Sequence, residues 1–265
     1  MSAIAVEHVR PTRTAPRRIP MSRVVSVELQ KMFDTRSGFW LMASIVIASV
    51  LATGAVILWA PDSELTYDTF AAAIGFPMSV ILPMVAILSV TSEWSQRSGL
   101  TTFTLLPHRG RVIGAKAVAT VVVGVTSMGV AMAIGALGNI VGTAITGTPR
   151  VWDDSVQHLA LIVLANVLGM LIGFTLGVVI RNSAGAIVGY FVFTLVLPTL
   201  SGLLAANASW WHDAQAWVDF NFAQGALFNG DVAAKDWAHL GVASVIWLAL
   251  PLAVGLRMLF RSEVK

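Results

Sequence analysis

The chain has 265 residues, of which 56% are apolar and only 12% are charged, and its formal net charge at pH 7 is +3. Soluble globular proteins carry about 25% charged residues, so this composition argues against a soluble domain and predicts a membrane protein. The chain has no cysteine, which excludes disulfides, thiolate nucleophiles and cysteine-based metal sites.

The N-terminal part of the chain has two segments of different character. Residues 1–20 are rich in arginine and proline, which predicts a disordered basic tail attracted to anionic lipid. In residues 21–36, apolar side chains recur at i, i+4, i+7 and i+8, one face of a helix, at Val25, Leu29, Met32 and Phe33. Such a helix lies in the membrane interface with its apolar face in the acyl boundary. Because Arg36, Ser37 and Gly38 then interrupt the apolar pattern, we expect a separate amphipathic elbow helix rather than a continuation of the first span.

Six long apolar runs follow, and none has a charged residue near its centre, where each charge would cost about 2.5–3.5 kcal/mol on insertion. Five of the runs match the ~20 residues that cross a hydrocarbon core of roughly 30 Å. The third run is longer, so it must tilt or extend beyond the bilayer. The runs predict an all-α integral membrane protein with six transmembrane helices, at residues 39–60, 70–92, 112–145, 158–180, 184–206 and 239–260.

The distribution of charge predicts the orientation of these helices. All basic residues except Arg150 and Lys235 lie in the N-terminal segment, near the breaks after the second and fourth runs, or at the C-terminal end, whereas most acidic residues lie in the opposite breaks. The positive-inside rule therefore predicts a multi-pass protein of the cell (plasma) membrane with both termini in the cytoplasm. Because the basic residues do not form one solvated patch, no nucleic-acid partner is expected.

Several kinds of chemistry have no support in the sequence. The middles of the runs contain no acid or histidine of the type that couples ion flow to transport. The five histidines are scattered without metal-ligand spacing, so no metal site is predicted. No catalytic serine motif and no phosphate-binding loop are present, so no catalytic residue is predicted. If the chain moves a solute uphill, another subunit must supply the energy.

The break after the second run has the features of a docking segment. Gly99 changes the direction of the chain and Pro107 ends whatever follows, which leaves room for about two helical turns. These turns present Leu100, Phe103 and Leu106 to the cytoplasm, where apolar side chains need a cover from lipid or from a partner protein.

With this loop, the chain resembles the permease subunits of type-2 ABC exporters over roughly residues 21–265. Those proteins have a cytoplasmic elbow helix, six spans, and a characteristic loop after the second span. Residues of this chain match the loop pattern at Glu93, Arg97, Gly99, Thr101, Leu106, Pro107, Arg109 and Lys116. The position of the loop after the second of six spans adds weight to the resemblance.

The resemblance implies a domain organisation and a set of partners. Residues 37–265 would form the six-span permease domain, and the loop would form a coupling helix that docks on a separate ATP-binding cassette ATPase. ATP and Mg²⁺ would be held by that ATPase, and this chain would hold no cofactor. Two permeases and two ATPases would form the exporter, with the solute path between the permeases. A re-entrant element would precede the last span, and residues 207–236 fit it because they are rich in tryptophan and phenylalanine.

The resulting hypothesis is a permease subunit that binds and gates but is not itself an enzyme. One alternative is a membrane-embedded enzyme or lipid-modifying factor whose acidic site lies in the outer loop 207–237, at Asp213, Asp219, Asn221 and Asp231. Another is an ATP-independent membrane scaffold. Trp247 lies in the middle of the last run, where it is either a packing residue or part of a substrate surface.

Overall fold

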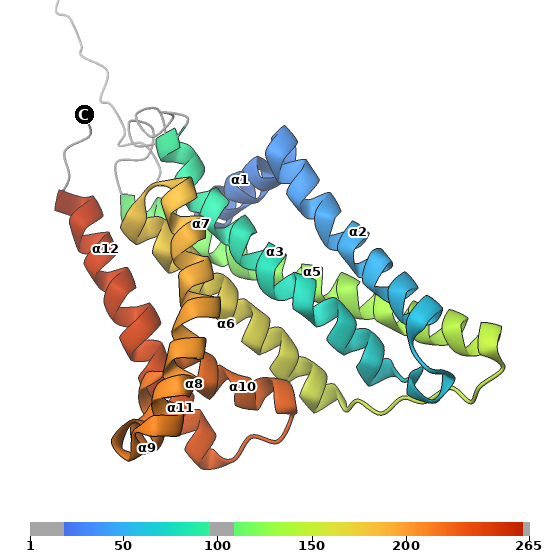
Figure 1. Cartoon of the computed structure of the whole chain (residues 1–265). Helices are drawn as coiled ribbons and strands as arrows, with labels where there is room; N and C mark the ends of the chain where they lie inside the picture. The colour runs from blue at the N-terminus through green and yellow to red at the C-terminus, as the bar shows by residue number, and fades with distance from the viewer. Residues whose placement is uncertain (1–18, 96–108, 262–265) are drawn as a thin grey trace, which may run out of the picture.

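The computed structural model describes residues 19–95 and 109–261 (Figure 1). Of these residues, 89% are helical and none forms a strand. Six helical spans are long and apolar enough to cross a membrane, as predicted. The chain is therefore built as a multi-pass, all-α protein.

The spans follow a shorter helix, α1 (Met21–Asp34), and several are built from more than one helical segment. The first four are α2 (Arg36–Trp59), α3 (Tyr67–Ser95), α5 (Arg109–Thr146) and α6 (Val156–Ile180). The fifth comprises α7 (Ser183–Phe191), the π-helix η2 (Val192–Val196) and α8 (Leu197–Asn207). The sixth comprises α11 (Ala234–Ser244), the π-helix η3 (Val245–Ala249) and α12 (Leu250–Arg261). The connections contain the 3-10 helix η1 (Asp62–Glu64) and two short helices, α9 (Ser209–Val218) and α10 (Phe220–Asn229).

The helices begin a few residues before the predicted runs because polar capping residues precede the apolar stretches. Thr35 accepts a hydrogen bond from the Gly38 backbone N–H at 3.0 Å, and Ser155 accepts one from that of His158 at 3.0 Å. The break between α1 and α2 is the single extended residue Thr35, so the helix of this segment is separate from the first span and ends two residues before the predicted boundary at residue 36. Gly38 still has a role there, since a Cβ at this position would lie 2.0 Å from the Met32 carbonyl oxygen.

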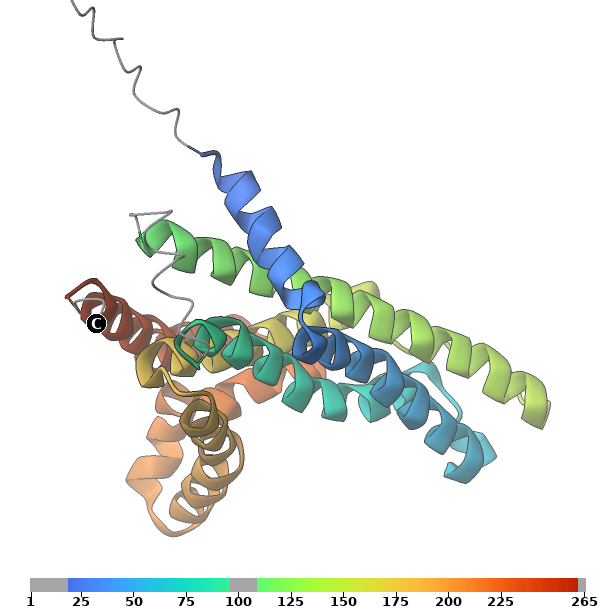
Figure 2. The ribbon, with the colours of Figure 1, turned by 90° about the horizontal axis from the view of Figure 1, so that it is seen from above.

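The two ends of the helix bundle differ (Figures 1 and 2). We call them the α1 end, which holds α1 and the start of α5, and the α10 end, which holds η1, α9 and α10. The 38 residues of α5 extend about 57 Å at ~1.5 Å per residue, which is longer than a hydrocarbon core. This length agrees with the expectation that the third run extends beyond the bilayer or tilts.

The central packing of the bundle joins α3 to α6. Gly173 and Gly177 of α6 face α3, where a Cβ on Gly173 would lie 2.8 Å from the Pro83 carbonyl oxygen and one on Gly177 would lie 3.3 Å from Val90 Cβ. Small residues at this four-residue spacing let the two backbones approach closely. In contrast, 22% of the most apolar stretch of the first span and 17% of those of the fifth and sixth are buried. These three spans present most of their apolar surface to their surroundings.

Candidate functional site

The segment of the predicted elbow helix is helical, as α1, but its apolar residues do not all lie on one exposed face. The side chains buried on α1 are Val24, Glu28 and Met32, at i, i+4 and i+8, because α1 packs on α5 and α2. Val25 and Leu29 are partly buried against the same core, and Phe33 remains half exposed. The assignment of all four predicted residues to the acyl boundary is therefore wrong for Met32, which lies in the protein core.

A buried ion pair lies at the centre of the α1 contact. Lys116 Nζ of α5 donates to Glu28 Oε2 at 2.5 Å and to the Ser89 carbonyl oxygen of α3 at 3.1 Å. The side chains of Glu28 and Lys116 are only 4% and 3% exposed. Lys31 donates to the other Glu28 oxygen, Oε1, at 2.7 Å. A buried charge costs free energy unless it is paired, and the bonds of Lys116 provide this pairing. Through them the contact joins α1, α3 and α5 at one point.

The helices joined by Lys116 are also those that flank the predicted coupling loop. α3 ends at Ser95 and α5 begins at Arg109, with Glu93 in the last turn of α3. Near the same end, the Thr91 and Ser183 hydroxyl oxygens lie 2.7 Å apart and link α3 to α7. The remaining predicted coupling residues lie outside the described part of the chain, and their role stays a prediction: Arg97, Gly99, Leu100, Thr101, Phe103, Leu106 and Pro107.

At the other end of the bundle, the predicted outer loop folds into α9 and α10. Gln224 of α10 donates from Nε2 to the Ala165 carbonyl oxygen of α6 at 2.6 Å, and Phe220 and Leu227 are buried beside it. This packing explains the high apolar content of the segment. It places two short helices against the spans, although whether they re-enter a bilayer stays a prediction.

The four residues of the alternative enzyme hypothesis have different surroundings in the structure. Asp219 Oδ1 accepts from the backbone N–H groups of Asn221 and Phe222 at 2.9 and 3.2 Å, so it caps α10. Asn221 donates from Nδ2 to the Phe193 carbonyl oxygen at 3.1 Å. Asp213 and Asp231 lie exposed. Asp219 and Asn221 thus hold the backbone in place, which is a structural use of both side chains.

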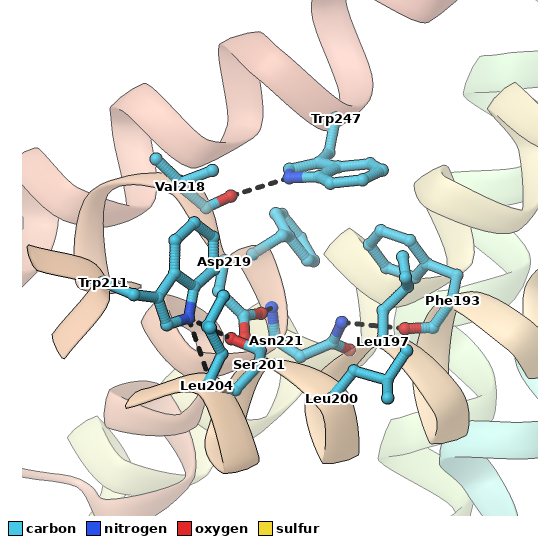
Figure 3. A pocket seen from close by; sticks show the side chains of 11 residues that line it. Phe193, Leu197, Leu200, Ser201, Leu204, Trp211, Val218, Asp219, Asn221 and Trp247 are labelled. Atoms are coloured by element: carbon cyan, nitrogen blue, oxygen red, sulfur yellow. Dashed lines mark hydrogen bonds between the residues drawn. The ribbon is translucent and has the colours of Figure 1, made fainter. Parts of the chain in front are cut away.

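An apolar cavity of about 210 Å³ lies where α8, the α9–α10 junction and η3 meet (Figure 3). Trp247 donates from Nε1 to the Val218 carbonyl oxygen at 2.7 Å, and its ring lies 5.2 Å from that of Phe193. On another wall, Trp211 donates from Nε1 to the Ser201 carbonyl oxygen at 3.0 Å. Trp247 therefore packs against its neighbours and also lines the cavity, whereas a part in a substrate surface stays a prediction.

The two π-helices that flank this cavity have the same cause. Pro198 and Pro251 each lie two residues after a π segment, and proline has no backbone N–H to continue an α-helical hydrogen-bond series. The register shifts in both cases, so that the Leu197 N–H bonds to the Val192 carbonyl and the Leu250 N–H to the Val245 carbonyl. Single π turns inside α-helices are frequent at functional sites. The fifth and sixth spans thus change register beside the same cavity.

Comparisons with known proteins do not assign the chain to a family. No protein-family model matches the sequence, and a search of curated proteins found no significant match. The candidate site therefore rests on the geometry described above.

Proposed function

We propose that the protein is the permease subunit of an ATP-driven exporter of the type-2 ABC class. In this proposal two copies form the solute path in the plasma membrane, with both termini in the cytoplasm. Separate ATPase subunits bind ATP and Mg²⁺ and dock on the loop between α3 and α5. The observation that carries the proposal is the contact of Lys116 with Glu28 and with the Ser89 carbonyl oxygen.

This contact gives a route by which a force on the loop reaches the membrane helices. Lys116 belongs to the loop pattern that resembles the exporter family, and Glu28 belongs to the helix expected to be the elbow. A movement of the loop would displace the end of α3 and the start of α5. Lys116 of α5 bonds to the Ser89 carbonyl of α3 and to Glu28 of α1, so the movement would reach α1. ATP can drive a conformational change only through contacts that differ between two states, and a docking site at this position can supply them.

The open faces of the bundle support a dimer. Leu195, Leu200 and Leu203 of the fifth span are each more than half exposed, as is Leu51 of the first span. Such faces are covered by lipid or by a second copy of the chain. We place the subunit contact at the first and fifth spans, and the apolar cavity beside the fifth span favours a hydrophobic solute.

The composition of the complex tests the proposal. The chain, tagged and extracted from its native membrane in a mild detergent, should carry a second copy of itself and two copies of an ATPase with a phosphate-binding loop. Native mass spectrometry measures this stoichiometry. A monomer that lacks any ATPase and still transports its solute would overturn the proposal.

Orientation is a separate prediction, and the chain without cysteine is a clean background for it. Ser63 and Ser209 are exposed near the α10 end, whereas Ser22 and Ser37 are exposed at the α1 end. In intact cells, a membrane-impermeant maleimide should label Ser63→Cys and Ser209→Cys but reach Ser22→Cys and Ser37→Cys only after permeabilisation. The reverse pattern would place the coupling loop outside the cell and exclude an ATPase partner.

A further inference from the structure

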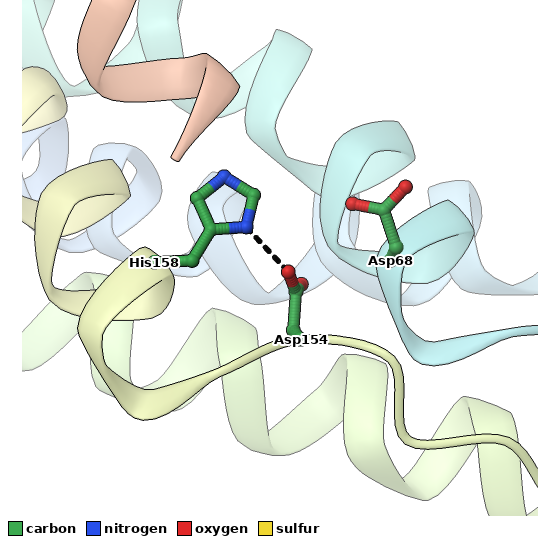
Figure 4. Close-up of side chains that lie close together, drawn as sticks. All are labelled: Asp68, Asp154 and His158. Atoms are coloured by element: carbon green, nitrogen blue, oxygen red, sulfur yellow. Dashed lines mark hydrogen bonds and ion pairs between the residues drawn. The ribbon is translucent and has the colours of Figure 1, made fainter. Parts of the chain in front are cut away.

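A cluster of two carboxylates and a histidine lies at the α10 end, apart from the cavity and from the Lys116 contact. Asp68 is near the start of α3, Asp154 precedes α6, and His158 is in the first turn of α6 (Figure 4). One side-chain ligand atom from each residue lies within 4.8 Å of the others. The backbone also holds the two segments together, because the Asp68 N–H donates to Asp153 Oδ1 at 3.0 Å.

The hydrogen bonds of His158 determine what its ring can bind. Nε2 lies 2.9 Å from the Phe228 carbonyl oxygen, which can only accept, so this nitrogen carries a proton. In the neutral ring Nδ1 then has a lone pair, and it faces Asp154 Oδ1 at 2.5 Å. Two lone pairs this close require a proton between them, and a metal ion bonded to both atoms at ~2.0 Å would displace that proton and move the atoms about 3 Å apart. A histidine that donates one N–H to a backbone carbonyl and offers its other nitrogen is the usual arrangement of a metal ligand.

The buried carboxylate of Asp154 is a second, independent indication of a bound cation. Its side chain is only 3% exposed, and Oδ2 has no hydrogen-bond partner in the described part of the chain. Its carboxylate lies between the His158 ring and the Asp68 side chain (Figure 4). A buried carboxylate oxygen without a partner is costly, and a cation in this gap would satisfy it.

We propose that Asp68, Asp154 and His158 bind a divalent transition-metal ion, with Zn²⁺ as the best match. One imidazole nitrogen and two carboxylates suit zinc, whereas Ca²⁺ prefers six to eight oxygen ligands. Asp68 is exposed, so its side chain can rotate to close the site, and the fourth position is left to water. The ion would displace the proton between Nδ1 and Asp154, and the two atoms would separate to accommodate it.

The bound ion would join three parts of the α10 end. Asp68 belongs to α3, Asp154 and His158 to the start of α6, and the Phe228 carbonyl to α10. Gly230, which ends α10 at a φ of +77°, packs on the same ring, where a Cβ would lie 2.7 Å from His158 Cδ2. Zinc would therefore join α3 to α6 and fix the His158 ring that bonds to α10, which borders the apolar cavity through Phe220 and Asn221.

Zinc titration of the full-length chain in detergent, purified without a histidine tag and stripped with EDTA, tests the proposal. We expect one Zn²⁺ per chain by native mass spectrometry and a rise in thermal unfolding temperature on adding zinc. Asp154→Asn and His158→Gln should abolish both effects. Asp68→Asn should weaken binding at least tenfold, and because Asp68 is exposed this variant should fold normally.

The chain offers a matched control at the same end. His212 and Asp213 also lie within ion-pair distance, 3.5 Å, but their side chains are 74% and 84% exposed. His212→Gln and Asp213→Asn should leave zinc binding unchanged. Absence of stoichiometric zinc on the native chain, or equal binding by Asp68→Asn, would overturn the site and leave a proton as the bridge between His158 and Asp154.

Discussion

Lys116→Met should destabilise the folded protein by about 3 kcal/mol, the usual cost of removing one partner from a buried ion pair. The substitution leaves the Glu28 carboxylate buried without its partner on α5, because only 4% of that side chain is exposed. Lys31 keeps its bond to Glu28 Oε1, which limits the loss. The measurement is the thermal unfolding of the purified chain in detergent, followed by tryptophan fluorescence.

Two further variants separate the buried pair from ordinary surface charge. Lys31→Met removes a pair whose lysine side chain is 42% exposed and should cost less than about 1 kcal/mol. The double variant Glu28→Leu/Lys116→Met replaces both buried charges with apolar side chains of similar size and should recover most of the stability lost by Lys116→Met. Equal losses of stability for Lys31→Met and Lys116→Met would show that the buried pair contributes no more to stability than the exposed one.

The double variant also tests the proposed function of the contact. If Lys116 transmits movement from the loop to α1, the double variant should fold well but export less solute per ATP hydrolysed. If the pair only stabilises the fold, recovery of stability should restore export as well. Stability and coupling are thus measured independently on one pair of residues.

The positions of the six spans could be predicted from the sequence because membrane insertion depends on local composition. A run of about 20 apolar residues specifies a crossing helix wherever it occurs in the chain. The ends of the helices were harder to predict, since they depend on single capping residues. Thr35 shows this, because one extended residue there separates α1 from α2.

The contacts between spans could not be predicted in the same way. Glu28 and Lys116 are 88 residues apart, and no spacing pattern in the sequence predicts that they pair. A weak signal did exist, since Glu28 lies four residues from both Val24 and Met32 on the buried face of α1. No metal site at His158 is predicted from the sequence, because the histidines have no ligand spacing, and the carboxylates of Asp68 and Asp154 are brought near it only by the fold.

The register shifts beside the cavity are an intermediate case. Pro198 and Pro251 predict an interruption of the α-helical hydrogen bonds in their spans, because proline lacks a backbone N–H donor. The sequence does not say whether a helix responds with a kink or with a π turn. The sequence also does not predict that η2 and η3 border the same cavity, because this depends on how α9 and α10 pack against the spans.

Phe103→Asp should have the largest effect on function, namely loss of the ATPase from the complex and loss of export. From the sequence, Leu100, Phe103 and Leu106 share one face of the loop that the ATPase is proposed to cover. Burying a phenylalanine there is worth roughly 1.5–3 kcal/mol, whereas an unpaired aspartate costs several kcal/mol. A pull-down of the ATPase with wild-type and variant chains measures the first loss, and solute export from cells measures the second.

The six spans should be unaffected by Phe103→Asp, so its thermal unfolding in detergent should match that of the wild type. Thr102→Asp places the same charge one position away, off the apolar face, and should retain the ATPase. Phe103→Leu keeps an apolar side chain and should retain it as well. Glu93→Ala, at the membrane edge of the loop, should lower export more than assembly. Normal ATPase recovery and normal export with Phe103→Asp would exclude this loop as the coupling element, because a buried aspartate cannot be tolerated at an interface that transmits the force of ATP binding.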